Sequence, residues 1–229
     1  MGLKGGPDIP FQNLQLLIDD KNSTINLNSS IVSGVTKLAG TLTSATMAGS
    51  GYTYSLTFST SGSKLSFGDI SSLNLTANIT ITAWIYPITF GGGSSARIYD
   101  KYKSTFPQSG YAFFIDNNVG TNSIAYSSGY TVSSSTARFN NQVTTNTWQH
   151  FAVTHSGSTV TIYKNGTSIG SSTITAPSSA SGIEAIIGNN TAGTNNFDGK
   201  IATCRVYNKV LSASEINKLY TSTKLRYGL

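Results

Sequence analysis

The chain has 229 residues, a formal net charge of +6 and only 10% charged residues, against about 25% in a typical globular protein. Aromatic and β-branched residues are plentiful, which excludes a disordered chain. The length suits one large all-β domain that buries about 70–75% of its unfolded surface. The basic residues form no adjacent block, so we expect no nucleic-acid binding; a general affinity for acidic proteins or anionic glycans fits the charge better.

Signals for targeting and for disulfide formation are sparse. Residues 1–8 lack the apolar core of a secretory signal, and no run of about 18 apolar residues predicts a membrane span. Cys204 is the single cysteine, so no disulfide can form within the chain. Its apolar surroundings predict a buried, inert thiol, and the lack of disulfides mildly favours assembly in a reducing cytoplasm.

The first half of the chain predicts strands separated by polar loops. A Gly/Pro-punctuated arm covers 1–12, and 21–50 form a long irregular connection with one or two short strands. Strict alternation of apolar and polar residues marks 52–58 as a strand, and Pro87 ends a later one because proline cannot continue a central strand. The strands predicted in this half are 14–18, 52–58, 64–67, 79–86, 97–102 and 110–115.

The second half adds more strands and one helix. Asn165-Gly166 predicts a two-residue hairpin turn, because both residues readily take positive φ angles. Ser212 and Glu215 have the spacing of a capping box at the start of a helix, and the apolar residues that follow share one face of it. The strands predicted here are 123–126, 148–154, 160–164, 183–187 and 200–207, and the residues of the helix face are Ile216, Leu219 and Tyr220.

These elements predict an all-β fold: a two-sheet antiparallel jelly-roll sandwich with one short C-terminal helix. We place the domain at residues 13–221, after the arm at 1–12 and before a C-terminal tail at 222–229. Arm and tail are expected to be loose unless a partner orders them.

The order and spacing of several short fragments resemble the laminin-G-like domains of the concanavalin-A-like lectin/glucanase superfamily. The fragments lie between Leu14 and Tyr220: 14–19, 54–58, 73–75, 79–87, 148–154, 160–166, 187–189, 197–201 and 211–216. Within that superfamily the chain is most similar to laminin-G-like structural proteins of tailed bacteriophages, which often end in a short basic-aromatic-Gly-Leu tail, here Leu225–Leu229. The resemblance implies a jelly-roll fold that hosts lectins, hydrolases, adhesins and structural modules alike.

Catalysis is not expected. The resemblance brings in glycan hydrolases that carry two glutamates and an aspartate on one strand, and such carboxylates must flank the scissile bond about 5–10 Å apart. Glu184 and Glu215 are the only glutamates in this chain, and the second belongs to the capping box. His150 and His155 are five residues apart, so they point to opposite faces of a strand and cannot bind one metal ion; we expect them at surface or strand-end positions.

A calcium site is a weaker alternative that the resemblance implies, because many relatives carry one. Calcium binds several hard oxygen ligands, and the candidates are Asp100, Asp116 with Asn117, and Asp198 with Asn189 and Asn190. No other cofactor is expected.

The aromatic residues divide into two groups. Four lie in apolar strands and are predicted to be core residues: Trp84, Phe113, Trp148 and Phe151. Five lie near loops, where a sugar ring could stack on them: Tyr99, Tyr102, Phe106, Tyr126 and Tyr130. The alternative for the second group is ordinary half-exposed strand packing.

The resemblance, with the missing catalytic acids, implies a protein that binds. The first hypothesis is a non-enzymatic bacteriophage virion protein, a capsid decoration or a head or tail fibre component, made in the host cytoplasm and bound to other virion proteins. The alternative is a carbohydrate-binding adhesin that recognises host surface glycan through loop aromatics and amides. A hydrolase ranks third. Oligomerisation stays open, since exposed edge strands and low charge invite assembly.

Overall fold

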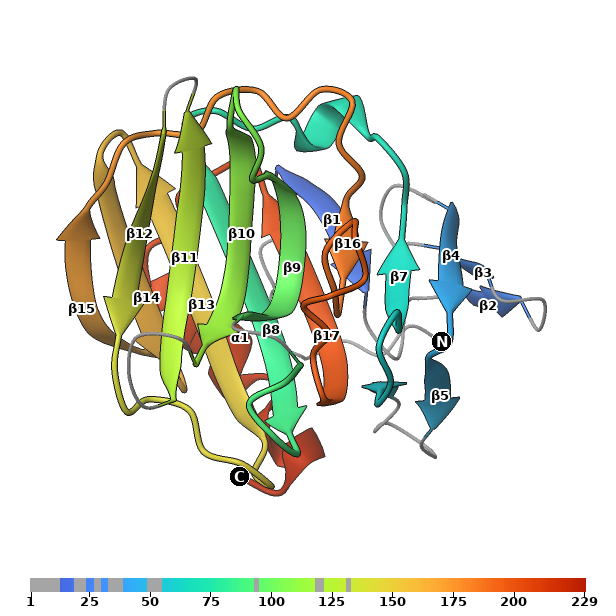
Figure 1. Ribbon diagram of the computed structural model, residues 1–229. Helices are drawn as coiled ribbons and strands as arrows, with labels where there is room; N and C mark the ends of the chain where they lie inside the picture. Colours follow the sequence, from blue (N-terminus) through green and yellow to red (C-terminus); the bar gives the residue numbers. More distant parts are fainter. Residues whose placement is uncertain are drawn as a thin grey trace, which may run out of the picture.

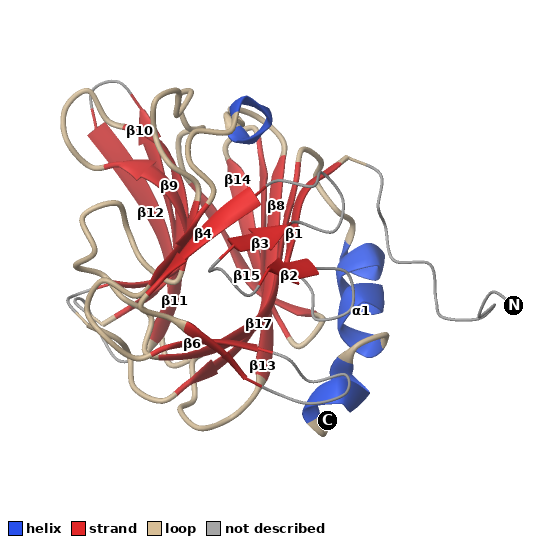
Figure 2. Cartoon of the chain, turned by 90° about the vertical axis from the view of Figure 1, so that its right-hand side faces the viewer, coloured by secondary structure: helices blue, strands red, loops and turns tan. Residues whose placement is uncertain are grey.

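A computed structural model of the chain describes residues 13–18, 24–26, 30–32, 39–48, 55–92, 95–117, 122–130 and 133–229 (Figure 1). The predicted arm at 1–12 and the first part of the strand predicted at 52–58 lie outside the described residues. Two antiparallel sheets stack face to face, and a short helix lies on the outside of one of them (Figures 1 and 2). The predicted two-sheet jelly-roll sandwich is therefore confirmed.

The sheet at the rear of Figure 1, here called the back sheet, has eight strands. Its order is β15-β14-β13-β8-β17-β6-β5, and β1 pairs with β17 away from that path. The strands are β1 (Leu14–Ile18), β5 (Thr46–Ala48), β6 (Ser55–Phe58), β8 (Ile79–Pro87), β13 (Gln149–Ser156), β14 (Thr159–Lys164), β15 (Thr167–Thr173) and β17 (Gly199–Tyr207).

The sheet toward the viewer in Figure 1, here called the front sheet, has nine strands in the order β12-β11-β10-β9-β16-β7-β4-β3-β2. The strands are β2 (Thr24–Asn26), β3 (Ser30–Val32), β4 (Ala39–Thr43), β7 (Lys64–Ser66), β9 (Ser95–Lys103), β10 (Ser109–Asp116), β11 (Ser123–Tyr130), β12 (Ser133–Phe139) and β16 (Ile186–Ile187). A short 3-10 helix, η1 (Ser71–Leu73), precedes β8. The segment predicted as a long irregular connection thus adds several short strands, because β3 and β4 pair with each other and β4 pairs with β7.

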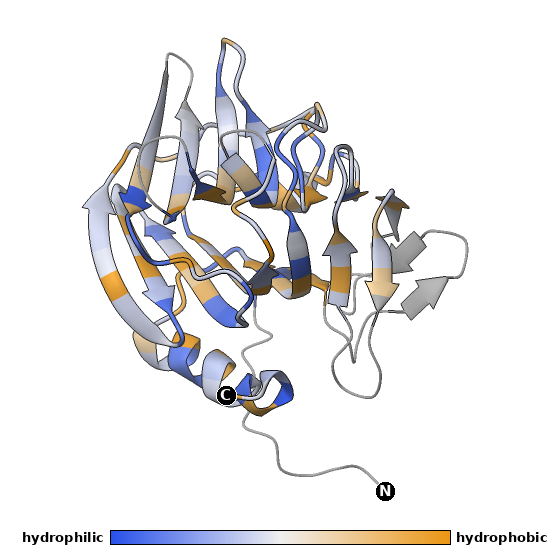
Figure 3. Ribbon diagram, turned by 60° about the horizontal axis from the view of Figure 1, so that its bottom comes forward, coloured by the Kyte–Doolittle hydropathy of each residue, from blue (hydrophilic) through white to orange (hydrophobic). Residues whose placement is uncertain are grey.

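The main core lies between the two sheets and follows the period-two alternation of their strands. Ile81 and Ile85 of β8 and Phe113 of β10 are fully buried members of this core. Hydrophobic and hydrophilic residues alternate along the strands of both sheets in Figure 3. Cys204 is also buried in the core, and burial raises the pKa of its thiol to about 12, which agrees with the predicted inert cysteine.

Helix α1 (Ala213–Thr221) packs on the outer face of the back sheet (Figure 2). The predicted capping box is confirmed: the Glu215 N–H donates to the Ser212 hydroxyl, and the Ser212 N–H donates to the Glu215 carboxylate at 2.8 Å. Ile216 and Leu219 are fully buried in a second apolar cluster with Leu17 of β1. No helix in the described ranges is long and apolar enough to cross a membrane.

The last residues are not a loose tail, which corrects the predicted boundary at 222. They form the 3-10 helix η2 (Lys224–Tyr227), and its buried Tyr227 ring lies 4.2 Å from the Trp84 ring, centroid to centroid. The Trp84 indole N–H donates to the Thr223 hydroxyl at 2.8 Å. The C-terminal segment therefore covers the outer face of β8 and belongs to the folded domain.

The two histidines correct one half of their expectation, which was a surface or strand-end position. His150 and His155 contact opposite sides of the back sheet, as their spacing predicts, but both are fully buried. His150 packs against Trp84 under the C-terminal segment, and burial lowers its pKa to about 3, so it is neutral at pH 7. His155 Nδ1 lies 3.2 Å from the Tyr126 hydroxyl on the core side. Neither histidine is at the surface, but each lies one residue from an end of β13, which agrees with the strand-end alternative.

The turn between β14 and β15 is the predicted hairpin. Asn165 and Gly166 have φ angles of 49° and 80°, the left-handed values that a two-residue turn of this kind requires. A Cβ atom on Gly166 would lie 2.9 Å from the Asn217 side-chain nitrogen of α1. The turn thus needs glycine both for its backbone angle and for its close approach to the helix.

Candidate functional site

The outer face of the front sheet carries a continuous row of mostly polar residues that crosses its strands. Backbone pairing places one residue of each strand in register, and alternate residues of each strand face outward, away from the core. The row, from β4 to β12, is Thr41, Ser66, Ile186, Asp100, Ala112, Ser127 and Thr136. Neighbouring strands are about 4.8 Å apart; Ile186 and Ala112 interrupt the polar residues of the row, and Asp100 and Ser127 are buried.

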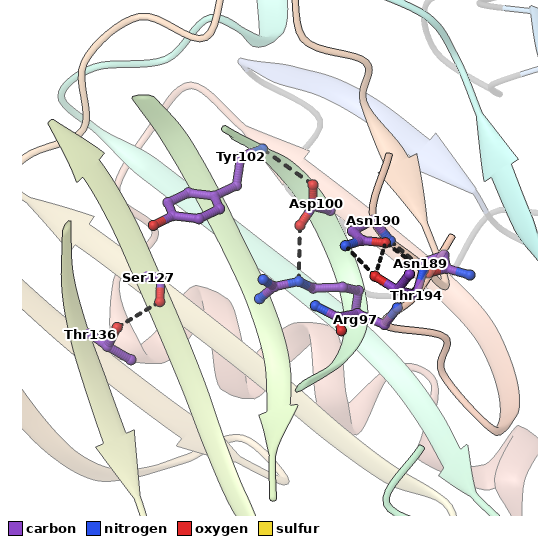
Figure 4. A network of polar contacts seen from close by, with 9 residues as sticks. Arg97, Asp100, Tyr102, Ser127, Thr136, Asn189, Asn190 and Thr194 are labelled. Atoms are coloured by element: carbon purple, nitrogen blue, oxygen red, sulfur yellow. Dashed lines mark hydrogen bonds and ion pairs between the residues drawn. The ribbon is translucent and has the colours of Figure 1, made fainter. Parts of the chain in front are cut away.

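The floor of this face near β10 and β11 is built from two alanines and a phenylalanine. Ala112, Phe114 and Ala125 form a buried apolar cluster, and the half-buried Tyr102 of β9 packs against it. Figure 4 shows the Tyr102 ring between the Arg97–Asp100 pair and the Ser127–Thr136 pair. Tyr102 is half-buried, so part of its side chain is exposed to solvent at this face.

Arg97 and Asp100 form an ion pair beside Tyr102. Arg97 Nε lies 3.0 Å from Asp100 Oδ2, and the guanidinium stands 4.4 Å from the centre of the Phe114 ring. Asp100 also accepts the Tyr102 N–H at 3.3 Å. Burial outweighs the attraction of Arg97 and raises the pKa of Asp100 from 3.8 to about 6. This carboxyl group can therefore take up a proton close to neutral pH.

The far side of the face carries hydroxyl groups and a second arginine. Ser127 and Thr136 hydroxyls are 2.7 Å apart, and Arg138 Nε donates to the buried Asp116 carboxylate. In the next cross-strand row, Arg97 pairs with Phe114, Phe114 with Ala125, and Ala125 with Arg138. The two arginines thus stand at opposite ends of one row.

A turn of asparagine and threonine residues closes the β16 side of the site (Figure 4). The Asn189 side chain accepts the Asn190 N–H at 2.9 Å, and the Asn190 side chain accepts the Thr194 N–H at 2.9 Å. Beyond β16 the face has a hollow of about 490 Å³, lined by Thr41, Thr43, Lys64, Ser66, Phe67, Gly68 and Glu184. Lys64 and Ser66 hold the Glu184 carboxylate there, at 3.6 and 3.2 Å.

The five residues predicted to contact glycan differ in burial. Tyr102 lies in the site, and Phe106 is 75% exposed on the turn between β9 and β10. Tyr99 and Tyr126 are fully buried, which corrects their prediction: both face the sandwich core, where Tyr99 stacks on Tyr111 at 5.8 Å. The Tyr130 side chain lies outside the described residues. The predicted core positions of Trp84, Phe113 and Phe151 are confirmed, whereas Trp148 is half-buried.

The predicted calcium ligands do not form one set. Asp100 and Asp116 are buried strand residues, each paired with an arginine that occupies the oxygens a cation would need. Asp198 accepts the Thr89 hydroxyl at 2.6 Å. Among the described residues, no group of three or more His, Cys, Asp or Glu side chains could hold a metal ion. The structure does not favour calcium at Asp100 or Asp116, and Asp198 stays a prediction.

Sequence reasoning missed Arg97 as a site residue for a physical reason. Arg97 and Asp100 are three apart, so a regular strand would point them to opposite faces. The pairing of β9 with β10 skips one residue, because Phe113 pairs with Tyr99 and Phe114 with Arg97. This β-bulge at Ile98 brings both charged side chains to the outer face.

Comparison with known families identifies the superfamily to which this fold belongs. Residues 58–217 match the family model of the concanavalin A-like lectin/glucanases superfamily. The chain belongs to this superfamily. A comparison with curated protein sequences found no significant match.

Solved structures of low sequence identity share this superfamily fold. The binding domain of Paraclostridial mosquitocidal protein 1 has a TM-score of 0.68 and 15% identity over 92% of this chain and 52% of that one. Domain 4 of an extracellular arabinanase from Geobacillus stearothermophilus, solved with arabinotriose, has a TM-score of 0.68 and 16% identity over 91% and 98%.

Trypanosoma rangeli sialidase, solved with sialic acid, has a TM-score of 0.68 and 14% identity over 96% of this chain and 35% of the sialidase. The chain spans about half (52%) of the length of the mosquitocidal binding domain. At these identities the similarity establishes the fold alone, a laminin-G-like scaffold that also occurs in carbohydrate-binding proteins.

Proposed function

We propose that this superfamily member is a non-enzymatic binding module that recognises glycan on the outer face of the front sheet. The observation that supports this most directly is the half-buried Tyr102 ring, which packs against the cluster of Ala112, Phe114 and Ala125. Hydrogen-bonding side chains flank the ring: the Arg97–Asp100 pair on one side and the Ser127–Thr136 hydroxyls on the other. An apolar platform between a few convergent polar groups is the usual composition of a ligand site.

The similar structures support the same proposal. The arabinanase domain was solved with arabinotriose, and the sialidase with sialic acid. Both proteins share the two-sheet scaffold of this chain, so a glycan ligand is consistent with the fold. A host surface glycan remains the partner we propose for an adhesin of this type.

The arrangement of the acidic residues supports a non-enzymatic role. Asp100 lies opposite Ala112 on β10, four residues before Asp116, which separates the two positions by about 13 Å at about 3.3 Å per residue. Glycan hydrolases need carboxylates about 5–10 Å apart, and each of these two is paired with an arginine. Glu184 turns toward β7, where Lys64 and Ser66 hold it.

A glycan array tests the binding function. We expect wild-type protein to bind a subset of surface polysaccharides, and Tyr102→Ala to weaken that binding about tenfold or more, because the platform is lost. Tyr86→Ala is the matched control, since Tyr86 is a half-buried tyrosine on the outer face of the back sheet. If the wild-type protein shows no preferential binding to any host polysaccharide on the array, the proposed glycan-binding function is wrong.

We propose further that the protein is a virion component of a bacteriophage, made in the host cytoplasm and bound to other virion proteins. The support is the resemblance of Leu225–Leu229 to the C-terminal tails of phage laminin-G-like proteins, together with the exposed Leu225 side chain within this segment. Leu225 is 83% exposed while its neighbour Tyr227 anchors η2. Mass spectrometry of purified particles tests this role, and absence of the chain from them would exclude it.

A further inference from the structure

We infer that the glycan bound at this face is acidic, and that its carboxylate binds the terminal nitrogens of Arg97. The inference rests on the proposed glycan-binding function and names the chemical class of its ligand. Arg97, on the outer face of the front sheet, is only 8% exposed.

Arg97 is held in place but not fully paired. Its Nε faces Asp100 at 3.0 Å, and its guanidinium stacks on Phe114 at 4.4 Å and lies 5.9 Å from the centre of the Tyr102 ring. Its Nε and Nη1 atoms are both buried, and neither makes a hydrogen bond within the described part of the chain, so the contact of Nε with Asp100 is an ion pair only. A buried donor of a charged group is costly to leave unpaired, and Nη1, which faces no carboxylate, marks a place for a ligand acceptor.

A carboxylate is the acceptor that fits this donor best. The guanidinium is a planar fork that binds a carboxylate through two parallel hydrogen bonds. Asp100 occupies the Nε side of Arg97, which leaves the edge formed by the two terminal nitrogens for a second carboxylate. Stacking on the Phe114 ring at 4.4 Å and the ion pair with Asp100 hold the guanidinium in place before the ligand arrives.

The surroundings of Arg97 favour a sugar over an acidic peptide. The Tyr102 ring beside it offers a flat apolar surface, and the Ser127 and Thr136 hydroxyls match the hydroxyls of a sugar ring. Arg138 at the other end of the same cross-strand row is exposed and uses its Nε for Asp116. With three strand spacings of about 4.8 Å between them, the two arginines suit a polymer whose acidic groups repeat.

The negative charges at the face do not oppose this ligand as strongly as their number suggests. Asp116 and Glu184 are each paired with a basic side chain, Arg138 and Lys64. Asp100 is the carboxyl group nearest the bound carboxylate, and its pKa of about 6 lets it take up a proton when a second anion arrives. The charge of Arg97 then acts on the ligand alone.

The experiment uses matched pairs of immobilised oligosaccharides: oligogalacturonate, oligomannuronate and oligoglucuronate, each beside its carboxyl-reduced form, in which a primary alcohol replaces every carboxylate. We expect wild-type protein to bind at least one acidic form about tenfold more tightly than its reduced form. The double variant R97Q/D100N removes both charges and nearly keeps the side-chain shapes, and we expect it to lose this preference. Arg97→Lys keeps the positive charge but lacks the planar guanidinium, and we expect this variant to lose most of the preference for the acidic form.

Each outcome decides a different point. If a reduced form binds as tightly as its acidic partner, the inference is wrong but the proposed glycan-binding function stands. If no oligosaccharide binds, here or on the wider array, both are wrong. If polyglutamate competes with the acidic oligosaccharides as well as they compete with one another, the site binds carboxylates on any polymer. This result would contradict a specific glycan ligand. If a folded R97Q/D100N or Arg97→Lys protein keeps the full preference for the acidic form, Arg97 is not the residue that binds the carboxylate.

Discussion

Asp100 shows how burial changes the chemistry of a single residue. In an unfolded chain its carboxyl group is expected to titrate near 3.8, whereas burial raises its pKa to about 6 in the folded protein. Between these values the folded state holds a proton that the unfolded state has released. Asp100 therefore favours folding at low pH, and this contribution is lost as the pH rises through about 6.

This difference predicts a pH-dependent stability that a single substitution removes. The free energy of unfolding of the wild type minus that of Asp100→Asn should fall by about 2 kcal/mol between pH 4 and pH 6, because one pKa unit corresponds to about 1.4 kcal/mol and this window covers most of the interval between the two pKa values. Urea unfolding at a series of pH values measures it. A difference that stays constant over this range would show that Asp100 titrates normally.

Lys101 is the second residue whose buried environment matters for stability. Its side chain is fully buried, and its ammonium donates to the Asp69 carboxylate at 2.9 Å and to the Ile183 carbonyl at 2.5 Å. Asp69 also accepts the Gly182 N–H at 2.7 Å. One ion pair thus ties β9 to the long segment that leads into β16.

Removing the partner of a buried ammonium should destabilise the protein. Asp69→Ala leaves the Lys101 charge without its counter-ion, and we expect a loss of about 2–3 kcal/mol in the free energy of unfolding, less than for a fully buried pair because Asp69 is 38% exposed. Glu184→Gln is the control, since the Lys64–Glu184 pair is exposed and should change stability by about 0.5 kcal/mol or less. Equal effects of the two substitutions would contradict the role of the buried pair.

At the scale of elements, the C-terminal segment completes the outer face of the back sheet. Helix α1 covers one part of this face with Ile216 and Leu219, and η2 covers Trp84 with Tyr227. The Tyr227 ring also lies 4.8 Å from that of Trp148. Short 3-10 helices rarely hold together alone, so η2 depends on this aromatic contact.

The aromatic contact predicts unequal effects of two substitutions in the same helix. Tyr227→Ala should lower the free energy of unfolding by about 3 kcal/mol, because it removes a buried ring and uncovers Trp84. Leu225→Ala should leave stability nearly unchanged, since this side chain is 83% exposed. Thermal unfolding of both variants checks the contrast, and a Tyr227→Ala protein as stable as Leu225→Ala would mean that the segment is not part of the core.

At the scale of the whole molecule, the outer faces of the two sheets differ in what covers them. The outer face of the back sheet is covered by α1 and η2 and contributes to stability, whereas the outer face of the front sheet holds Tyr102 and the arginine–aspartate pairs (Figures 2 and 4). The core between the sheets fixes both faces at once. A ligand site on a sheet of this kind is rigid, because each side chain stands on a hydrogen-bonded strand.

The sequence alone determined the parts that depend on local periodicity. Alternation of apolar and polar residues predicted the strand around Trp84, the Asn165-Gly166 pair predicted the hairpin, and the capping box predicted α1. The ordered fragments also indicated the superfamily, which the family model confirms.

Tertiary structure alone decided which side chains meet at the candidate site. The bulge at Ile98 reverses the face of Arg97, so counting by twos from Asp100 would place it in the core. The burial of Tyr99 and Tyr126 likewise follows from the register of β9, β10 and β11, and not from their nearness to loops. Strand pairing joins residues far apart in the chain, and local sequence patterns do not encode which partners or bulges result.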